Sequence, residues 1–395
     1  MATIGIDARM IFYTGIGRHV LNLVTRIPRL DPDNDYRLFV RPEDEKRIAE
    51  LIGDENPRVT CVPTVSSIYN LREQTTHLRI LQQARLDLLH VPHFNIPILY
   101  RGKLIVTIHD LIQAHFPSQE TANAGLKRLA YKLVISLALR KAQRISVVSK
   151  YTRDDIIRTF HTPAEKIEVI YNGIDECWEK TTYDAGLAEH VLARYGVKKP
   201  FLLYVGLSSL HKNLLRLIEA MQFVRKHSAH DIQLAIAGKK DPRYLPQLEA
   251  KIKELHLEQA VVFTDFLGDA DLKIMYNSAE AFVFPSLYEG FGLPPLEALQ
   301  SGLPVVSSNA TSLPEVLGDA ATYFDPTSVL DMAKAITSVL KDKKNIPVYT
   351  KRFSWDVFAR QTLELYKSVL ATDGQTDAPA PPASNAASSD GHADR

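Results

Sequence analysis

The sequence predicts an α/β protein built from two doubly wound, Rossmann-like domains. Short apolar segments typical of buried parallel strands alternate with segments that have helical hydrophobic spacing. This alternation begins anew near Pro200, and 395 residues exceed what one hydrophobic core usually supports. We therefore expect a first domain over residues 1–178 and a second over residues 196–350, with a linker within 173–186.

The expected elements follow this alternation in both domains. In the first domain we expect strands at 3–8, 36–40, 88–92, 103–110, 144–149 and 166–173, with a helix over 14–27 after the first strand. In the second domain we expect strands at 200–206, 232–238, 260–266, 279–286 and 303–309, with helices over 214–224 and 269–279. A last helix is expected over 353–370. The segment 371–395 is rich in Ala, Pro, Ser and Asp, without hydrophobic periodicity, so we expect it to be disordered.

The composition excludes several classes of function. The formal net charge is +1, which is not the balance of a polyanion-binding protein, so we expect no nucleic-acid partner. Cys61 and Cys177 lie far apart and outside any CxxC pattern, which favours a reducing compartment and no cysteine metal site. The N-terminal segment lacks signal-peptide features, and no run of about 18 apolar residues occurs. We expect a cytoplasmic protein without a membrane span.

The segment 125–144 is the most basic part of the chain. It has a helical pattern with six cations, and no acidic residue falls between Glu120 and Asp154. Basic amphipathic helices can lie on an anionic membrane, which would make the protein peripheral on the inner face of the plasma membrane. A core-packed helix with a solvated basic face has the same pattern, and the sequence leaves both interpretations open.

The stretch "PSLYEGFGLPPLEALQSG" (285–302) places two glutamates at the end of an expected strand. Glu289 falls in a loop, and Glu297 falls in the first or second turn of the helix that Gly302 can end. Gly290 and Gly292 allow backbone to approach a ligand, and the free N–H groups of a helix start favour an anion. Ligands of open α/β sheets bind at such strand ends. A capped helix beside an incidental loop glutamate is the alternative.

Two further glycine loops follow the first strand of each domain. In "VGLSSLHKN" (205–213), Gly206 ends a strand, while His211 and Lys212 precede a helix, where a lysine can pair with a diphosphate. A solvated surface lysine fits the same pattern. In the first domain, Gly15 and Gly17 could meet a phosphate or sugar, but the GxGxxG match is partial because Val20 stands at the third glycine position.

The histidines give one candidate site residue and no metal site. His109 ends the expected strand 103–110, where it could donate a hydrogen bond to a sugar hydroxyl or phosphate, or merely pack against the strand end. His90 and His93 lack a third ligand, and "DPDND" (31–35) lacks the glycine and distal glutamate of a calcium loop. We therefore expect neither a bound metal nor another cofactor.

Taken together, these segments resemble the retaining glycosyltransferases of family 4, which have the GT-B fold. "PSLYEGFGLPPLEAL" resembles their E-x7-E motif. The resemblance covers nearly the whole chain up to residue 370 and includes "GIDARMIFYTGIGRHVLNL", "LLHVPHFNIP", "IVTIHDL", "ISVVSKYTRDDI", "VIYNGID", "YVGLSSLHKNLLRLIEA", "LAIAGKKD", "GLPVVSSNATSLPEVLGDAATYFDP" and "FSWDVFARQTLELY". This breadth and order are specific for the family and the fold, but not for the sugar that is moved.

The resemblance implies a role for each motif of the second domain. Glu297 would hold the ribose hydroxyls of a nucleotide-sugar, and Lys212 would neutralise its diphosphate. Glu289 would hold the donor sugar and the distal phosphate, together with backbone amides of Gly290, Phe291, Gly292 and Leu293. Backbone near Phe266 would meet the base.

In the first domain, the resemblance implies that Gly15 and Gly17 approach the diphosphate and that His109 faces the donor sugar. The final helix, 353–370, would cross back onto this domain. One position departs from the family pattern, because His211 stands where arginine often precedes the lysine, and a neutral histidine would weaken the diphosphate clamp.

The expected chemistry is metal-free transfer of a hexose with retention of configuration. Lys212 and helix N-termini would stabilise the charge that develops on the departing diphosphate. By resemblance, the donor is GDP-mannose, with UDP-glucose or another nucleotide-sugar behind it. The acceptor is lipid-linked or a polysaccharide, in bacterial cell-surface glycan synthesis such as that of lipopolysaccharide. A sugar-nucleotide epimerase, a phosphorylase and a non-catalytic sugar-nucleotide-binding subunit are the alternatives.

Overall fold

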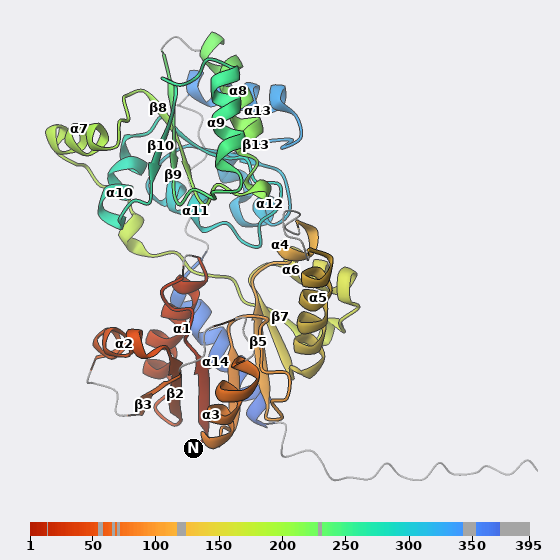
Figure 1. The fold of residues 1–395 in the computed structure, drawn as a ribbon. Helices are drawn as coiled ribbons and strands as arrows, with labels where there is room; N and C mark the ends of the chain where they lie inside the picture. The colour runs from red at the N-terminus through yellow and green to blue at the C-terminus, as the bar shows by residue number, and fades with distance from the viewer. Residues whose placement is uncertain are drawn as a thin grey trace, which may run out of the picture.

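The computed structural model contains two parallel β-sheets, each flanked by helices on both faces (Figure 1). It describes residues 1–13, 15–53, 58–64, 68, 72–116, 124–227, 231–342 and 353–371. The predicted tail 371–395 therefore lies outside the described residues, except for Ala371. The predicted α/β class with two doubly wound domains is confirmed.

The first domain has a 7-stranded sheet in the order β3-β2-β1-β4-β5-β6-β7. Its strands are β1 Thr3–Asp7, β2 Asp35–Val40, β3 Val59–Pro63, β4 Leu88–Val91, β5 Leu104–Ile108, β6 Arg144–Val147 and β7 Ile167–Val169. The α-helices between them are α1 Ile16–Leu30, α2 Glu45–Ile52, α3 Leu78–Gln83, α4 Ile112–His115, α5 Ala124–Lys141 and α6 Lys150–Phe160. β4 and β5 are buried along their whole length, which explains their uninterrupted apolar sequence.

The second domain has a 6-stranded sheet in the order β10-β9-β8-β11-β12-β13. Its strands are β8 Phe201–Val205, β9 Gln233–Ala237, β10 Val261–Asp265, β11 Ala281–Phe284, β12 Val305–Ser308 and β13 Ala321–Phe324. Its helices are α7 Ala185–Arg194, α8 Leu214–His227, α9 Leu245–Glu254, α10 Asp269–Ser278, α11 Leu293–Gln300, α12 Leu313–Leu317 and α13 Val329–Lys341. In both sheets the chain reverses direction of winding beside the first strand, so the carboxyl ends of β1 and β8 form crevices where ligands bind in such folds.

The packing of the second domain begins earlier than the predicted residue 196. The buried Trp178 belongs to the same apolar cluster as β8 and β11, and its carbonyl accepts a hydrogen bond from Ser301 at 2.8 Å. On α7, Ala188 and Val191 pack against Ile274 of α10. Part of the expected linker 173–186 therefore packs with the second domain. Its one tryptophan provides the apolar surface for this packing, although the residues around it in the sequence are mostly polar.

The predicted basic helix 125–144 is shorter than expected. α5 ends at Lys141, and Arg144 is already in β6. Lys141 donates hydrogen bonds from Nζ to the carbonyl oxygens of Ile98 and Tyr100. This lysine therefore stabilises the segment between β4 and β5 and is not simply a solvated cation.

The chain ends by returning to the first domain. The last helix, α14 Trp355–Ala371, packs beside α1, and Figure 1 shows it in blue among the red and orange elements. Tyr366 of α14 forms a 2.7 Å hydrogen bond with Nδ1 of His90 on β4, whose Nε2 bonds Thr107 of β5. Burial lowers the pKa of His90 to about 3, so the ring is neutral. In a neutral imidazole one nitrogen donates a hydrogen bond and the other accepts one, so both Tyr366 and Thr107 are needed as partners.

We predict that Tyr366→Phe lowers the stability of the protein by about 1–2 kcal/mol, because Nδ1 of the buried His90 then has no partner. Urea unfolding measures the effect. Tyr13→Phe, at an exposed tyrosine, is the control and should change nothing. Equal stability of both variants would show that the hydroxyl does not hold α14 in place.

Candidate active site

The loop between β11 and α11 carries both predicted glutamates. Glu289 lies in the loop and Glu297 lies in α11, whose first turn contains Pro294 and Pro295. Gly292, at the helix start, has φ 94°, and Gly302, just past the helix end, has φ 70°. Both values lie in the left-handed region, where glycine is the least strained residue. The helix therefore begins after Gly292 and ends before Gly302.

The same loop touches the other domain through backbone. A side chain at Gly290 would overlap the carbonyl oxygen of His109 and press on Cβ of Asp110. Only glycine permits this approach, so the loop of the second domain is placed directly against the carboxyl end of β5. The structure thus brings Glu289, Gly290 and His109 together, as the sequence-based site requires.

Lys212 and Glu289 form an ion pair at the centre of this region. Lys212 ends the short 3₁₀ turn Leu210–Lys212 after β8, and its Nζ lies 2.5 Å from Oε1 of Glu289. Both side chains are largely buried. An ammonium that is already desolvated can pair with a bound phosphate without the cost of losing its own water at that moment.

His109 is placed at the site, but its proton is committed elsewhere. Nε2 lies 3.0 Å from the carbonyl oxygen of Pro92, and because a carbonyl can only accept, Nε2 carries the proton. Burial lowers the pKa of His109 to about 4, so the ring is neutral. The expectation that His109 donates to a ligand is therefore wrong for this arrangement. Its Nδ1 can only accept, for example from a sugar hydroxyl.

Glu297 lies in α11, beyond the loop, and is buried with two side chains bonded to it. Its Oε2 accepts a hydrogen bond from Tyr276 at 3.0 Å, and its Oε1 is paired with Arg18 of α1. Arg18 also stacks over Trp178, with 4.8 Å between guanidinium carbon and ring centroid. Burial raises the pKa of Glu297, while Arg18 and Tyr276 act against that rise.

Arg18 is not among the site residues predicted from the sequence. Its position directly after Gly17, at the start of α1, was the available signal, because the glycine loop was already predicted to face the second domain. The pair with Glu297 joins residues separated by 279 positions, so no local pattern reveals it.

The glycines in the loops after β1 and β8 are explained in part by packing within the protein. A side chain at Gly17 would collide with the carbonyl oxygen of Ile11, so this glycine is explained by internal packing. Gly15, at the start of α1 with φ 72°, has open space around it. A side chain at Gly206 would meet the Tyr204 hydroxyl.

The remaining predicted residues lie in three places: His211 beside Lys212, Phe291 and Leu293 around the start of α11, and Phe266 after β10. Burial, with a smaller contribution from Lys212, lowers the pKa of His211 to about 4, so this residue adds no charge to the neighbouring lysine. Phe291 is buried between Tyr171 and Phe353, so only its backbone can meet a ligand. Leu293 begins α11. Phe266 is 62% exposed at the end of β10.

Two anchors that the sequence analysis missed hold the domains together. The Tyr288 hydroxyl donates to Asp155 of α6 at 2.5 Å, and the ring is buried in the apolar cluster of the first domain. Glu315 of α12 accepts hydrogen bonds from the backbone N–H groups of Lys150 and Tyr151, at 2.7 and 3.0 Å. These N–H groups are free because they begin α6, and a carboxylate is the group that a helix start favours.

Asp110 adds a further carboxyl group beside the Lys212–Glu289 pair. Its Oδ1 accepts from the backbone N–H of Ile112 at 2.9 Å. Burial raises the pKa of Asp110, Glu289 raises it further, and Lys212 lowers it. The Lys212 ammonium is therefore bonded to Glu289 and acts on Asp110 through its charge.

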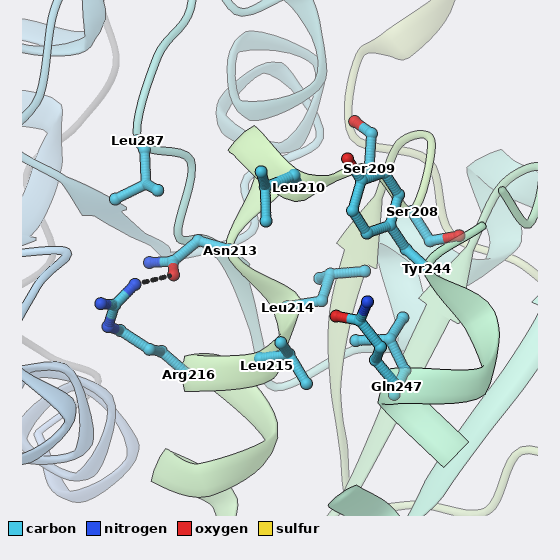
Figure 2. Close-up of a pocket in the computed structure, with 11 residues that line it drawn as sticks. Ser208, Ser209, Leu210, Asn213, Leu214, Leu215, Arg216, Tyr244, Gln247 and Leu287 are labelled. Carbon is cyan, nitrogen blue, oxygen red and sulfur yellow. Dashed lines mark hydrogen bonds between the residues drawn. The ribbon is translucent and has the colours of Figure 1, made fainter. Parts of the chain in front are cut away.

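A small surface pocket lies beside Leu210 and the first turn of α8 (Figure 2). Its lining combines five leucines with six residues that carry polar groups, and Figure 2 shows Arg216 bonded to Asn213 at its wall. Neither Glu289 nor Glu297 lines it. Within the described residues, no group of three or more His, Cys, Asp or Glu side chains is arranged to hold a metal ion, and the metal-free reaction stays a prediction.

Family models match both domains. The model described as "Glycosyl transferases group 1" matches residues 193–353, and the model described as "Glycosyltransferase Family 4" matches residues 13–176. The chain belongs to glycosyltransferase family 4. The predicted family and enzyme class are confirmed, and the site described above is the candidate active site of this glycosyltransferase.

The glycosyltransferase is similar over most of its length to curated proteins. It is 28% identical to O-antigen chain mannosyltransferase B of Escherichia coli, across 90% of this chain and 96% of that protein. It is 27% identical to alpha-maltose-1-phosphate synthase of Mycolicibacterium smegmatis, across 91% of this chain and 96% of that protein. These relatives differ in the sugar that their names imply, so they agree on transfer and not on donor.

Solved structures confirm the GT-B fold of the glycosyltransferase. Sucrose-phosphate synthase from Thermosynechococcus elongatus superposes with a TM-score of 0.72 at 19% identity, covering 94% of this chain and 100% of that one. Anabaena Alr3699/HepE in complex with UDP and glucose superposes with a TM-score of 0.73 at 19% identity, covering 93% and 100%.

We predict that Arg18→Met destabilises the glycosyltransferase by about 2 kcal/mol at pH 8, because a buried carboxylate loses its cation. The loss should shrink toward pH 5. A buried Glu297 without Arg18 has a pKa further above its unfolded value, so the variant loses stability as the pH rises from that unfolded value through the folded one.

Thermal unfolding at pH 5 and pH 8 measures this difference. Arg26→Met is the matched control on the same helix, because its partner Asp356 is exposed and needs no cation. A variant whose melting temperature differs from the wild type equally at both pH values would contradict the proposed dependence on Glu297.

Proposed function

We propose that this glycosyltransferase transfers mannose from GDP-mannose to a lipid-linked or polysaccharide acceptor in bacterial cell-surface glycan synthesis, on the cytoplasmic side of the membrane. The observation that best supports a transfer reaction is the Lys212–Glu289 pair. It lies beside a glycine loop that meets the first domain at His109. The choice of mannose rests on the likeness to O-antigen chain mannosyltransferase B across nearly the whole of both chains.

In this proposal the residues bind the donor from one end to the other. Glu297 receives the two ribose hydroxyls, which replace the guanidinium of Arg18, while Tyr276 keeps its bond to the other oxygen. Lys212 turns from Glu289 to the diphosphate. The N–H groups at the start of α11 face the distal phosphate, and Nδ1 of His109 accepts a bond from a hydroxyl of the sugar.

The reaction that fits these groups breaks the bond between the anomeric carbon and the phosphate oxygen. The acceptor hydroxyl attacks from the same face and forms the new glycosidic bond, and its proton passes to the departing diphosphate. Negative charge grows on that diphosphate, so Lys212 stabilises the transition state more than the bound donor. Because the protein groups supply this charge, the proposal requires neither a metal ion nor a cofactor.

A second candidate donor is a glucosyl nucleotide such as UDP-glucose. The likeness to alpha-maltose-1-phosphate synthase, at 27% identity over most of both chains, favours it. Melting temperatures with a panel of nucleotide-sugars distinguish the two donors, because a ligand that binds the native state stabilises it. A larger increase with a UDP-hexose than with GDP-mannose would overturn the mannose assignment.

We predict that Lys212→Ala lowers kcat by about 10²- to 10³-fold, because the leaving diphosphate loses its cation. Release of nucleoside diphosphate in the presence of acceptor measures this. Lys253→Ala, at an exposed lysine of α9, is the control, and Lys212→Arg should retain part of the activity because it keeps the charge. Activity of Lys212→Ala close to the wild type would exclude the diphosphate role.

We also predict that dialysis against EDTA leaves kcat unchanged. Activity that disappears with EDTA and returns with magnesium or manganese would contradict charge stabilisation by protein groups alone.

We further propose that α5 docks the enzyme on anionic lipid. Leu129 and Leu133 are 66% and 57% exposed, one helical turn apart, and exposed Arg128, Lys132 and Arg140 lie along the same helix. Apolar side chains flanked by cations suit the interface of a bilayer. No helix within the described ranges is long and apolar enough to cross a membrane.

We predict that the protein sediments with vesicles containing phosphatidylglycerol and not with pure phosphatidylcholine vesicles. Arg128→Gln with Lys132→Gln should weaken this binding about tenfold or more, since each cation near an anionic surface contributes about 1 kcal/mol. Lys198→Gln with Lys253→Gln, which removes two exposed cations elsewhere, should bind as the wild type does. Equal binding of both double variants would place the contact on another surface.

A further inference from the structure

The carboxyl ends of four neighbouring strands form one continuous edge in the second domain. The strand order β10-β9-β8-β11 is held at this edge by close backbone contacts: Gly238 N–H donates to the Asp265 carbonyl at 2.9 Å, and Gly206 N–H donates to the Ala237 carbonyl at 2.8 Å. Three strand spacings separate β10 from β11, about 14 Å. This span is comparable to the length of a nucleotide-sugar, and Glu289 follows the strand at one end of it.

The position of Glu297 fixes which end receives the base. Tyr276 of α10 bonds Glu297, and Arg18 bridges Glu297 and Asp269 in the first turn of α10, at 3.7 Å from Asp269. A ribose held by Glu297 therefore lies beside the start of α10. With the diphosphate directed toward Lys212, the base on that ribose falls at the segment 265–268 between β10 and α10.

Asp265 stands at this place in an unusual state. Its φ is 60°, in the left-handed region that favours glycine, and its side chain is 64% exposed, so apolar packing does not explain the residue. The Nζ of Lys240 lies 3.2 Å from each of its two carboxylate oxygens. An exposed pair of this kind is weak, so a ligand with two adjacent hydrogen-bond donors can displace the lysine. The neighbouring Phe266 presents a largely exposed ring.

We propose that Asp265 is the residue that selects a guanine base, by accepting hydrogen bonds from the N1–H and the exocyclic 2-amino group. This inference rests on the proposed function, since it assumes a nucleotide donor at Glu297 and Lys212. The edge of guanine offers two adjacent donors that match the two oxygens of a carboxylate. Uracil offers a single N–H there, and the N1 of adenine is an acceptor that a carboxylate would repel.

The test compares the binding of GDP, IDP and UDP to the full-length protein by isothermal titration calorimetry. Inosine differs from guanosine only by lacking the 2-amino group, so GDP and IDP isolate one of the two hydrogen bonds. We expect GDP to bind the wild type about tenfold more tightly than IDP, the loss typical of one bond to a charged group, and more tightly still than UDP.

Two variants separate recognition from folding. Asp265→Gly suits the backbone conformation and should melt no lower than the wild type, yet bind GDP and IDP equally. Lys240→Ala removes the neighbouring cation, keeps the carboxylate and should still prefer GDP to IDP. Equal binding of GDP and IDP by the wild type, or an unchanged preference in Asp265→Gly, would overturn the inference.

Failure of the inference and failure of the proposed function give different results. A wild type that binds UDP more tightly than GDP and transfers a hexose from a UDP-sugar would overturn the role of Asp265 and leave the transferase site intact. A protein that binds none of the three nucleotides would overturn the assignment of Glu297 and Lys212, and the base site with it.

Discussion

The site depends on the electrostatic cost of burying carboxylates where two domains meet. Glu289 and Glu297 are both almost inaccessible, and an ionised carboxylate removed from water requires a cation or strong donors beside it. Lys212 supplies that cation to Glu289 from within the second domain, whereas Arg18 supplies it to Glu297 from the first. Each carboxylate thus has its own cation, one supplied from within the second domain and one from the first.

The two partners differ in what they do for the fold. The Lys212–Glu289 pair joins two loops of the same sheet and can form in one domain alone. The Arg18–Glu297 pair exists only when the domains are brought together. In the proposed function, a donor that displaces Arg18 would remove one contact between the domains, while Tyr288 on Asp155 and Glu315 on α6 would still hold them.

Local patterns in the sequence predicted the fold and the course of the chain from β11 through its loop into α11. The strands are recognisable as short apolar runs. The loop after β11 is recognisable by its glycines and by two prolines in the first turn of the next helix, because these residues act through backbone conformation. The weaker predictions concern residues whose role comes from distant neighbours. The pattern around His109 places it at a strand end, but only the Pro92 carbonyl reveals that its Nε2 proton is already used.

The sequence by itself determined two doubly wound domains, the glycine loops at their strand ends, and which carboxylates and lysine stand there. These features depend on hydrophobic periodicity and backbone freedom, which neighbouring residues set. Only the tertiary structure decided which cation each carboxylate holds, that Trp178 and α7 pack with the second domain, and that Asp265 ends β10 on the same sheet edge as β8 and β11. Ion pairs and strand order bring together residues that are far apart in the chain, and a local sequence pattern does not predict which distant residues will meet.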